Sequence, residues 1–147
     1  MKPLPHTYTV TALSSEEKII KFYSDAVTTI EADAPPEFDG SEKYWSPETL
    51  LAGAVSSCYA LTFGGMARKA NLRWDQLHTE VRGKLERNNG QTRFTEFTIN
   101  ARLELPADQD EAKAESILKR AEELCLITNP LDAEIHLEVK VLIKESA

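Results

Sequence analysis

The sequence predicts one α+β domain, residues 1–147, in which an antiparallel-rich sheet packs against a long central helix and a second helix. Three observations support this fold class. The order of the expected elements is strands, helix, hairpin, helix, strand. The turn Asn88-Asn89-Gly90 separates two strand-like runs, and Asn-Gly accepts the positive φ of a tight hairpin. A chain of 147 residues is also long enough to bury a core of its own.

The N-terminal third is expected to contain short strands and a loop. Residues 6–13 alternate as a strand does, and residues 19–23 and 26–31 are expected to form a hairpin that turns at Ser24-Asp25. Residues 34–41 include two adjacent prolines, which lack the backbone donor that a strand ladder needs. We therefore expect a loop there.

The central helix has a clear start. Ser46 can cap the free amides, Pro47 suits the first helical position, and Glu48 complements the positive end of the helix dipole. The helix is expected to end near residue 70. Its most apolar part, residues 50–63, is shorter than the ~18–20 residues of a membrane span and is interpreted as a core helix. A first-turn acid would by itself account for Glu48.

The second half of the chain predicts a hairpin, a helix and a final strand. Residues 76–87 and 92–105 are expected to be the two strands of the hairpin. Apolar side chains recur with helical spacing over residues 111–125, and residues 133–144 alternate as a strand does.

Composition narrows the class of protein. The net charge of -7, without a run of Lys or Arg, argues against a partner with a phosphate backbone or an anionic membrane. The first residues lack the apolar stretch of a signal peptide. We therefore expect a soluble cytoplasmic protein that acts on small molecules or proteins, with no nucleic acid and no membrane as partner.

Cys58 and Cys125 are the two cysteines, and a permanent disulfide is not expected in a reducing compartment. Together with His6, His78 and His136 they form no zinc-ligand spacing, so no metal and no cofactor is expected. Inert buried thiols and a redox pair both remain open. The small apolar neighbours of Cys58 would raise the pKa of its thiol unless a cation stabilises the thiolate.

Two segments carry a resemblance to a known family. They are Pro35-Pro36-Glu37-Phe38 followed by Trp45-Ser46-Pro47-Glu48-Thr49-Leu50-Leu51-Ala52 and Ser57-Cys58, and the later Cys125-Leu126-Ile127-Thr128-Asn129. They resemble the motifs of the OsmC/organic hydroperoxide resistance superfamily. In that superfamily a Ser/Asn-Pro-Glu helix start precedes the reactive cysteine by ten residues, as Glu48 precedes Cys58 here.

The resemblance implies an OsmC-like fold, an intertwined homodimer and a cysteine-based peroxidase in oxidative stress defence. Cys58 would reduce an organic hydroperoxide, and hydrogen peroxide less well, and become a sulfenic acid. Cys125 would then form a disulfide with it, which a dithiol reductant, possibly lipoyl, reopens. Glu48 would belong to the same site. Because ten helical residues rise about 15 Å, Glu48 would have to serve the Cys58 of a second subunit or act through an intermediary.

The sequence departs from the family at two positions. Leu126 stands where the second motif usually has proline, and no arginine precedes Arg68, although the family uses an N-terminal arginine to hold the thiolate. The N-terminal cations are lysines, which lack the planar fork that matches a carboxylate. An OsmC-like protein that binds a small apolar molecule, or acts structurally, is therefore the alternative. A Cys-His hydrolase is weaker, because no histidine has a recognisable context.

Overall fold

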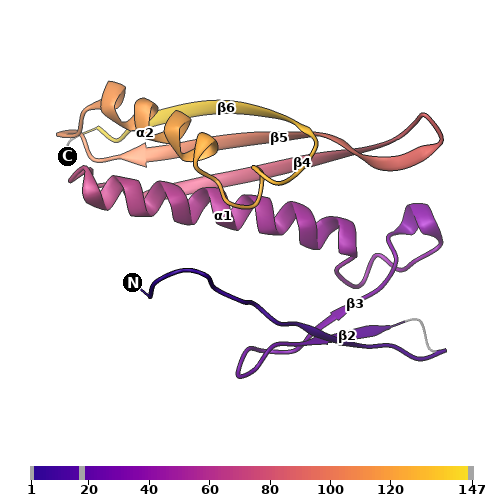
Figure 1. The fold of residues 1–147 in the computed structure, drawn as a ribbon. Coiled ribbons are helices and arrows are strands. Elements are labelled where there is room, and N and C mark those ends of the chain that lie inside the picture. The colour runs from indigo at the N-terminus through magenta and orange to yellow at the C-terminus, as the bar shows by residue number, and fades with distance from the viewer. Residues whose placement is uncertain (1, 17–18, 146–147) are drawn as a thin grey trace. The chain divides into compact units, whose positions relative to one another are not determined.

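The computed structural model describes residues 2–16 and 19–145, and it divides into two units, Met1–Leu50 and Leu51–Ala147. The central helix α1, Pro47–Lys69, begins in the first unit and continues in the second (Figure 1). The interpretation of residues 1–147 as one domain stays a prediction.

Unit 1 contains a three-stranded antiparallel sheet of order β1-β2-β3, made of Thr11–Leu13, Ile20–Tyr23 and Ile30–Ala32. β2 and β3 form the predicted hairpin, but its second strand is Ile30–Ala32 rather than residues 26–31. The first strand is shorter than the expected residues 6–13, because β1 pairs only with the four-residue β2. The alternating pattern of residues 6–13 extends beyond the residues that β2 can pair with.

The predicted loop folds around a buried aspartate and includes a short 3₁₀ helix, η1, Pro36–Phe38. The carboxylate of Asp33 accepts hydrogen bonds from the backbone amides of Ala34 at 2.8 Å and Ser41 at 3.0 Å. A Cβ on Gly40 would lie 1.6 Å from the carbonyl oxygen of Ala34, so only glycine fits there. This loop leads the chain into α1.

The start of α1 is the predicted one. Ser46 Oγ accepts a hydrogen bond from the amide of Thr49 at 3.1 Å, and the amide of Ser46 donates to Thr49 Oγ1 at 2.8 Å. The two side chains therefore cap the helix reciprocally, and Pro47 occupies its first position. The helix ends at Lys69, close to the expected residue 70.

Helix α1 is more uniformly apolar than expected. Its 23 residues are long and apolar enough to cross a membrane, a property that core helices of soluble proteins share. The expectation that no segment reaches this length was wrong, because Gly64, Gly65 and Met66 extend the apolar stretch beyond residue 63. Only 22% of its most apolar window is buried in the chain.

Unit 2 contains a mixed sheet of order β4-β5-β6, made of Gln76–Asn88, Gln91–Leu105 and Glu134–Ile143. β4 and β5 are antiparallel, and the predicted hairpin turn is confirmed, with φ of 50° at Asn89 and 80° at Gly90. β6 is parallel to β5 and returns through α2, Glu111–Glu123. A parallel pair requires such a crossover.

The core of unit 2 lies between the sheet and the two helices, which cover one face of it (Figure 1). Alternate residues of β5 are almost fully buried, and so is one face of each helix. The buried residues are Val55, Tyr59, Phe63 and Ala67 of α1, Phe97, Ile99, Ala101, Leu103 and Leu105 of β5, and Ala114, Ile117, Leu118 and Ala121 of α2. The α+β class is confirmed, with two sheets rather than one.

The end of α2 differs from the prediction of a helix over residues 111–125. The helix ends at Glu123, and Leu124 leaves helical geometry with φ −99° and ψ 2°. The amide of Cys125 donates to the carbonyl of Glu122, in a tighter turn than the α-helical one. Apolar spacing continues through Leu124 and Cys125 because both border the core, so the spacing does not mark where the helix ends.

Candidate functional site

The structure brings Cys58 and Cys125 together within unit 2. Both are free thiols, and they lie close enough that each shifts the pKa of the other. Cys58 lies in the middle of α1 and is half-buried, whereas Cys125 lies just beyond α2 and is fully buried. A reagent from solvent therefore meets Cys58 first, and Cys125 stands behind it.

Helix packing fixes the position of Cys58. Its neighbour Tyr59 and the preceding Val55 are buried in the core, so Cys58 lies at the edge of the packed face of α1. The hydroxyl of Tyr59 donates to the carbonyl of Leu118 on α2 at 2.9 Å. This buried bond ties the helix that carries Cys58 to the helix that leads to Cys125.

A tight turn after α2 surrounds the thiols with hydrogen-bond donors. The amide of Asn129 donates to the carbonyl of Cys125 at 3.2 Å, and Thr128, which is 3% exposed, points its hydroxyl into the same turn. The amides of Leu126 and Ile127 approach the sulfur of Cys58, and the hydroxyl and amide of Thr128 approach that of Cys125. Convergent donors of this kind stabilise a thiolate.

The two thiols differ in acidity. Burial raises the pKa of the Cys58 thiol, the Cys125 thiol raises it further, and the amides of Ile127 and Leu126 offset this only in part. Burial also acts to raise the pKa of Cys125, but the hydroxyl and amide of Thr128, the Cys58 thiol and the amide of Ile127 together lower it. The two thiols titrate as a pair, and their pKa values shift in opposite directions.

The causes of the two pKa shifts tell whether a cation lies close enough to stabilise either thiolate. Among the described residues, neither Lys nor Arg contributes to the shift of either thiol. The expectation that apolar surroundings raise the pKa of Cys58 is confirmed. Backbone amides act to lower the pKa of both thiols, and the hydroxyl and amide of Thr128 act in addition on Cys125.

The apolar residues around the thiols differ from those expected. From the sequence, the apolar residues Val55, Tyr59 and Leu61 near Cys58 are expected to form the pocket walls, but Val55 and Tyr59 are fully buried in the core and cannot contact a substrate. Leu61, the third expected wall, is 77% exposed on α1, and exposed apolar side chains also flank Cys125, among them Leu126 at 79% and Leu124 at 43%. The helical period explains the error, because Val55 and Tyr59 are four residues apart and share the inward face.

Glu48 lies in unit 1, in the first turn of α1, and its relation to the thiols stays a prediction. Its Oε2 atom is buried and has no hydrogen-bond partner in the described part of the chain. Glu48 and Cys58 are ten residues apart on one continuous helix, which corresponds to about 15 Å. Lys18, one of the N-terminal cations, lies outside the described residues.

Sequence reasoning missed two sets of residues. Thr128 was quoted only as part of a motif, although a hydroxyl three residues after a cysteine in a turn can reach back to it. His136 was given no role, yet Glu96 and Glu134 lie beside it. Glu134 and His136 are two residues apart on one strand and therefore share a face, which the sequence could have indicated. Glu96 lies on another strand, and no spacing along the chain connects it to them.

Comparisons with known proteins agree with this fold. The family model described as OsmC-like protein matches residues 40–140. The uncharacterized protein YmaD of Bacillus subtilis (strain 168) is 26% identical over 113 residues, 75% of each chain. An OsmC-like protein of unknown function from Vibrio cholerae superposes with a TM-score of 0.81, at 22% identity over 93% of this chain and 99% of that one. An organic hydroperoxide resistance protein from Elizabethkingia anophelis gives a TM-score of 0.75, at 20% identity over 98% and 100%.

Proposed function

The chain belongs to the OsmC-like protein family, and from this premise we propose that it is a cysteine-based peroxidase that reduces organic hydroperoxides. The observation that carries the proposal is the thiol pair, in which a half-exposed Cys58 and a buried Cys125 lie close enough to shift each other's pKa. The likeness to an organic hydroperoxide resistance protein supports the same activity.

In the first step, the accessible Cys58 attacks the hydroperoxide. The thiolate sulfur bonds to the terminal peroxide oxygen, the O–O bond breaks, and the alkoxide leaves as an alcohol after it takes a proton. Cys58 first loses its proton to solvent, which generates the attacking thiolate. The amides of Leu126 and Ile127 then stabilise the charge on Cys58.

In the second step, Cys125 resolves the sulfenic acid. Its sulfur attacks the sulfur of Cys58, water leaves, and a disulfide forms between the two. A dithiol reductant, possibly lipoyl, donates two electrons and restores both thiols. The close approach of the thiols supports this step, because a disulfide needs Cα atoms within about 7 Å.

The active form is an intertwined homodimer with Glu48 of one subunit near the Cys58 of the other. Three observations support this. α1 is apolar and sparsely buried in the chain, Glu48 Oε2 is buried without a partner among the described residues, and Glu48 is too far along α1 to reach its own Cys58. A second copy would cover the apolar surface of α1.

A second candidate is a member of the family that binds a small apolar molecule without useful peroxidase turnover. The raised pKa of Cys58 and the absence of arginine before Arg68 favour it. Leu61 and Leu126 would contact an apolar ligand under either reading.

Peroxide consumption by the purified protein decides between them. With dithiothreitol or dihydrolipoamide as reductant, we expect catalytic reduction of an alkyl hydroperoxide, and slower reduction of hydrogen peroxide because it has no apolar tail to desolvate. Cys58→Ser should abolish the reaction. Absence of turnover, together with thiols that do not ionise near neutral pH, would instead support the binding protein.

A further inference from the structure

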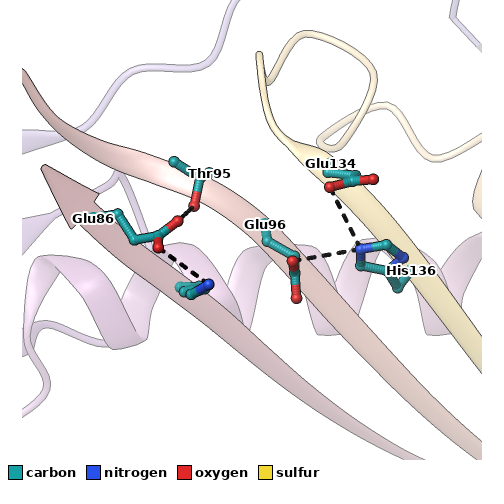
Figure 2. A network of polar contacts seen from close by, with 6 residues as sticks. Glu86, Thr95, Glu96, Glu134 and His136 are labelled. Carbon is teal, nitrogen blue, oxygen red and sulfur yellow. Dashed lines mark hydrogen bonds and ion pairs between the residues drawn. The ribbon is translucent and has the colours of Figure 1, made fainter. Parts of the chain in front are cut away.

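The face of the β4-β5-β6 sheet that points away from the helices is polar and carries a cluster of metal-ligand side chains. Alternate residues of β5, opposite in orientation to the buried ones, lie on this face, and Glu96 is among them. In the parallel register of β5 and β6, Glu96 pairs with Glu134 and Thr98 pairs with His136. Glu96, Glu134 and His136 therefore project from the same face (Figure 2).

The three side chains converge on one point. His136 Nε2 lies 3.5 Å from Glu96 Oε2 and 3.8 Å from Glu134 Oε2, and all three atoms lie within 4.8 Å of one another. Two ligands of one tetrahedral zinc ion, each bound at about 2.1 Å, are about 3.4 Å apart. The side chain of Glu134 is 72% exposed, so a small rotation can bring it to this distance.

The neighbouring cations are engaged elsewhere. Lys84 lies opposite Glu96 on β4, but its ammonium is 3.1 Å from Glu86, which also accepts a hydrogen bond from Thr95 (Figure 2). Arg93 is 2.9 Å from Asp132. In the described chain, neither Lys nor Arg is within ion-pair distance of Glu96 or Glu134. Lys84 still senses the charge of Glu96, which contributes to its raised pKa, so a nearby cation balances the two carboxylates of the cluster only in part.

We propose that Glu96, Glu134 and His136 form a binding site for a first-row divalent cation, with zinc as the best match. One imidazole and two carboxylates suit zinc, and water would complete the coordination. The site is separate from the thiol pair, which lies on the helix-covered side of the sheet. This proposal is independent of the peroxidase function.

The position of the cluster indicates which strands a bound ion would connect. Glu134 is the first residue of β6 and follows the segment that carries Cys125, whereas Glu96 lies within β5. A bound ion would join the two strands where their pairing begins. We expect it to stabilise the start of β6, since a ligand that binds only the folded state raises the unfolding temperature.

Zinc titration calorimetry on the full chain tests the site. Because thiols also bind zinc, the titration uses the Cys58→Ser/Cys125→Ser protein, which removes the thiol pair as a competing site. We expect one zinc ion per chain and an affinity that falls at least tenfold in His136→Gln, since even residues outside the coordination shell change affinity by about 10- to 100-fold. Glu96→Gln should weaken binding in the same way.

His78→Gln is the matched control, because His78 is an exposed histidine on the same open face but outside the cluster. It should bind zinc unchanged. The same three single variants in the otherwise native chain, titrated with a thiol reductant that does not chelate zinc, provide a second arm if the serine protein folds poorly. Far-UV circular dichroism establishes that each variant is folded, and zinc should raise the unfolding temperature only where His136 is intact.

Two results would overturn the proposal. One is zinc affinity that is the same with and without His136 in both backgrounds, which would mean that the cluster is only a set of surface ion pairs. The other is an equal loss of affinity in His78→Gln, which would assign the zinc to another part of the open face.

Discussion

Substituting Thr128 with valine should make Cys125 less acidic. The Thr128 hydroxyl is buried, lies 3.4 Å from the backbone carbonyl oxygen of Cys125, and is close enough to the Cys125 thiol to lower the pKa of that thiol. Valine keeps the branched shape but lacks the donor. A hydrogen bond to a charged group contributes about 1.5–3 kcal/mol. At a fixed pH below the pKa, the ratio of thiolate to thiol should therefore fall by roughly 10- to 100-fold.

The assay is the ultraviolet absorbance of the thiolate as a function of pH, in a Cys58→Ser background that leaves Cys125 as the single thiol of the chain. Thr128→Ser is the control, because serine retains the hydroxyl and should keep the titration near that of the parent. Thr128→Val should move the titration to higher pH.

Stability gives an independent readout with a defined sign. A thiol whose pKa is lowered by folding stabilises the protein above its unfolded pKa, and this contribution is lost as pH falls through the folded pKa. The destabilisation by Thr128→Val relative to Thr128→Ser should therefore grow as pH rises. A titration curve that is unchanged, or that moves to lower pH, would refute the role of this hydroxyl.

Three further predictions follow from the thiol pair, the apolar helix and the buried bond between the helices. In single-turnover experiments, Cys58→Ser should abolish peroxide reduction, whereas Cys125→Ser should retain the first turnover and stop recycling. Mild oxidation of the native protein should give an intramolecular disulfide in peptide maps. Intermolecular disulfides alone would exclude Cys125 as the resolving thiol. Sedimentation equilibrium should show a dimer, and a stable folded monomer at micromolar concentration would contradict the proposed assembly. Tyr59→Phe should lower the free energy of unfolding in urea by about 1–3 kcal/mol, because it leaves a buried carbonyl without its side-chain donor. A loss of less than about 0.5 kcal/mol, as for a typical surface substitution, would contradict a stabilising role for this bond.

Local signals in the sequence predicted most of the fold. The cap at Ser46, the turn at Asn89-Gly90 and the helix start at residue 111 are each set by a few residues, and each is confirmed. Errors occurred where distant partners decide the outcome. β1 is as long as β2 allows, and α2 ends before Cys125 although the apolar spacing continues.

The sequence by itself determined the α+β class, the family and the two cysteines as the candidate pair, because these depend on residue type and local spacing. Tertiary structure decided how the pair is arranged. Cys58 and Cys125 are 67 positions apart (125 − 58), and only the packing of α1 against α2 brings them within hydrogen-bond reach. The same holds for the acidity of Cys125, because the donors of Ile127 and Thr128 that lower its pKa lie in a turn that forms only after α2 ends. Likewise, Glu96 meets His136 only through the register of a parallel strand pair, which no spacing along the chain encodes.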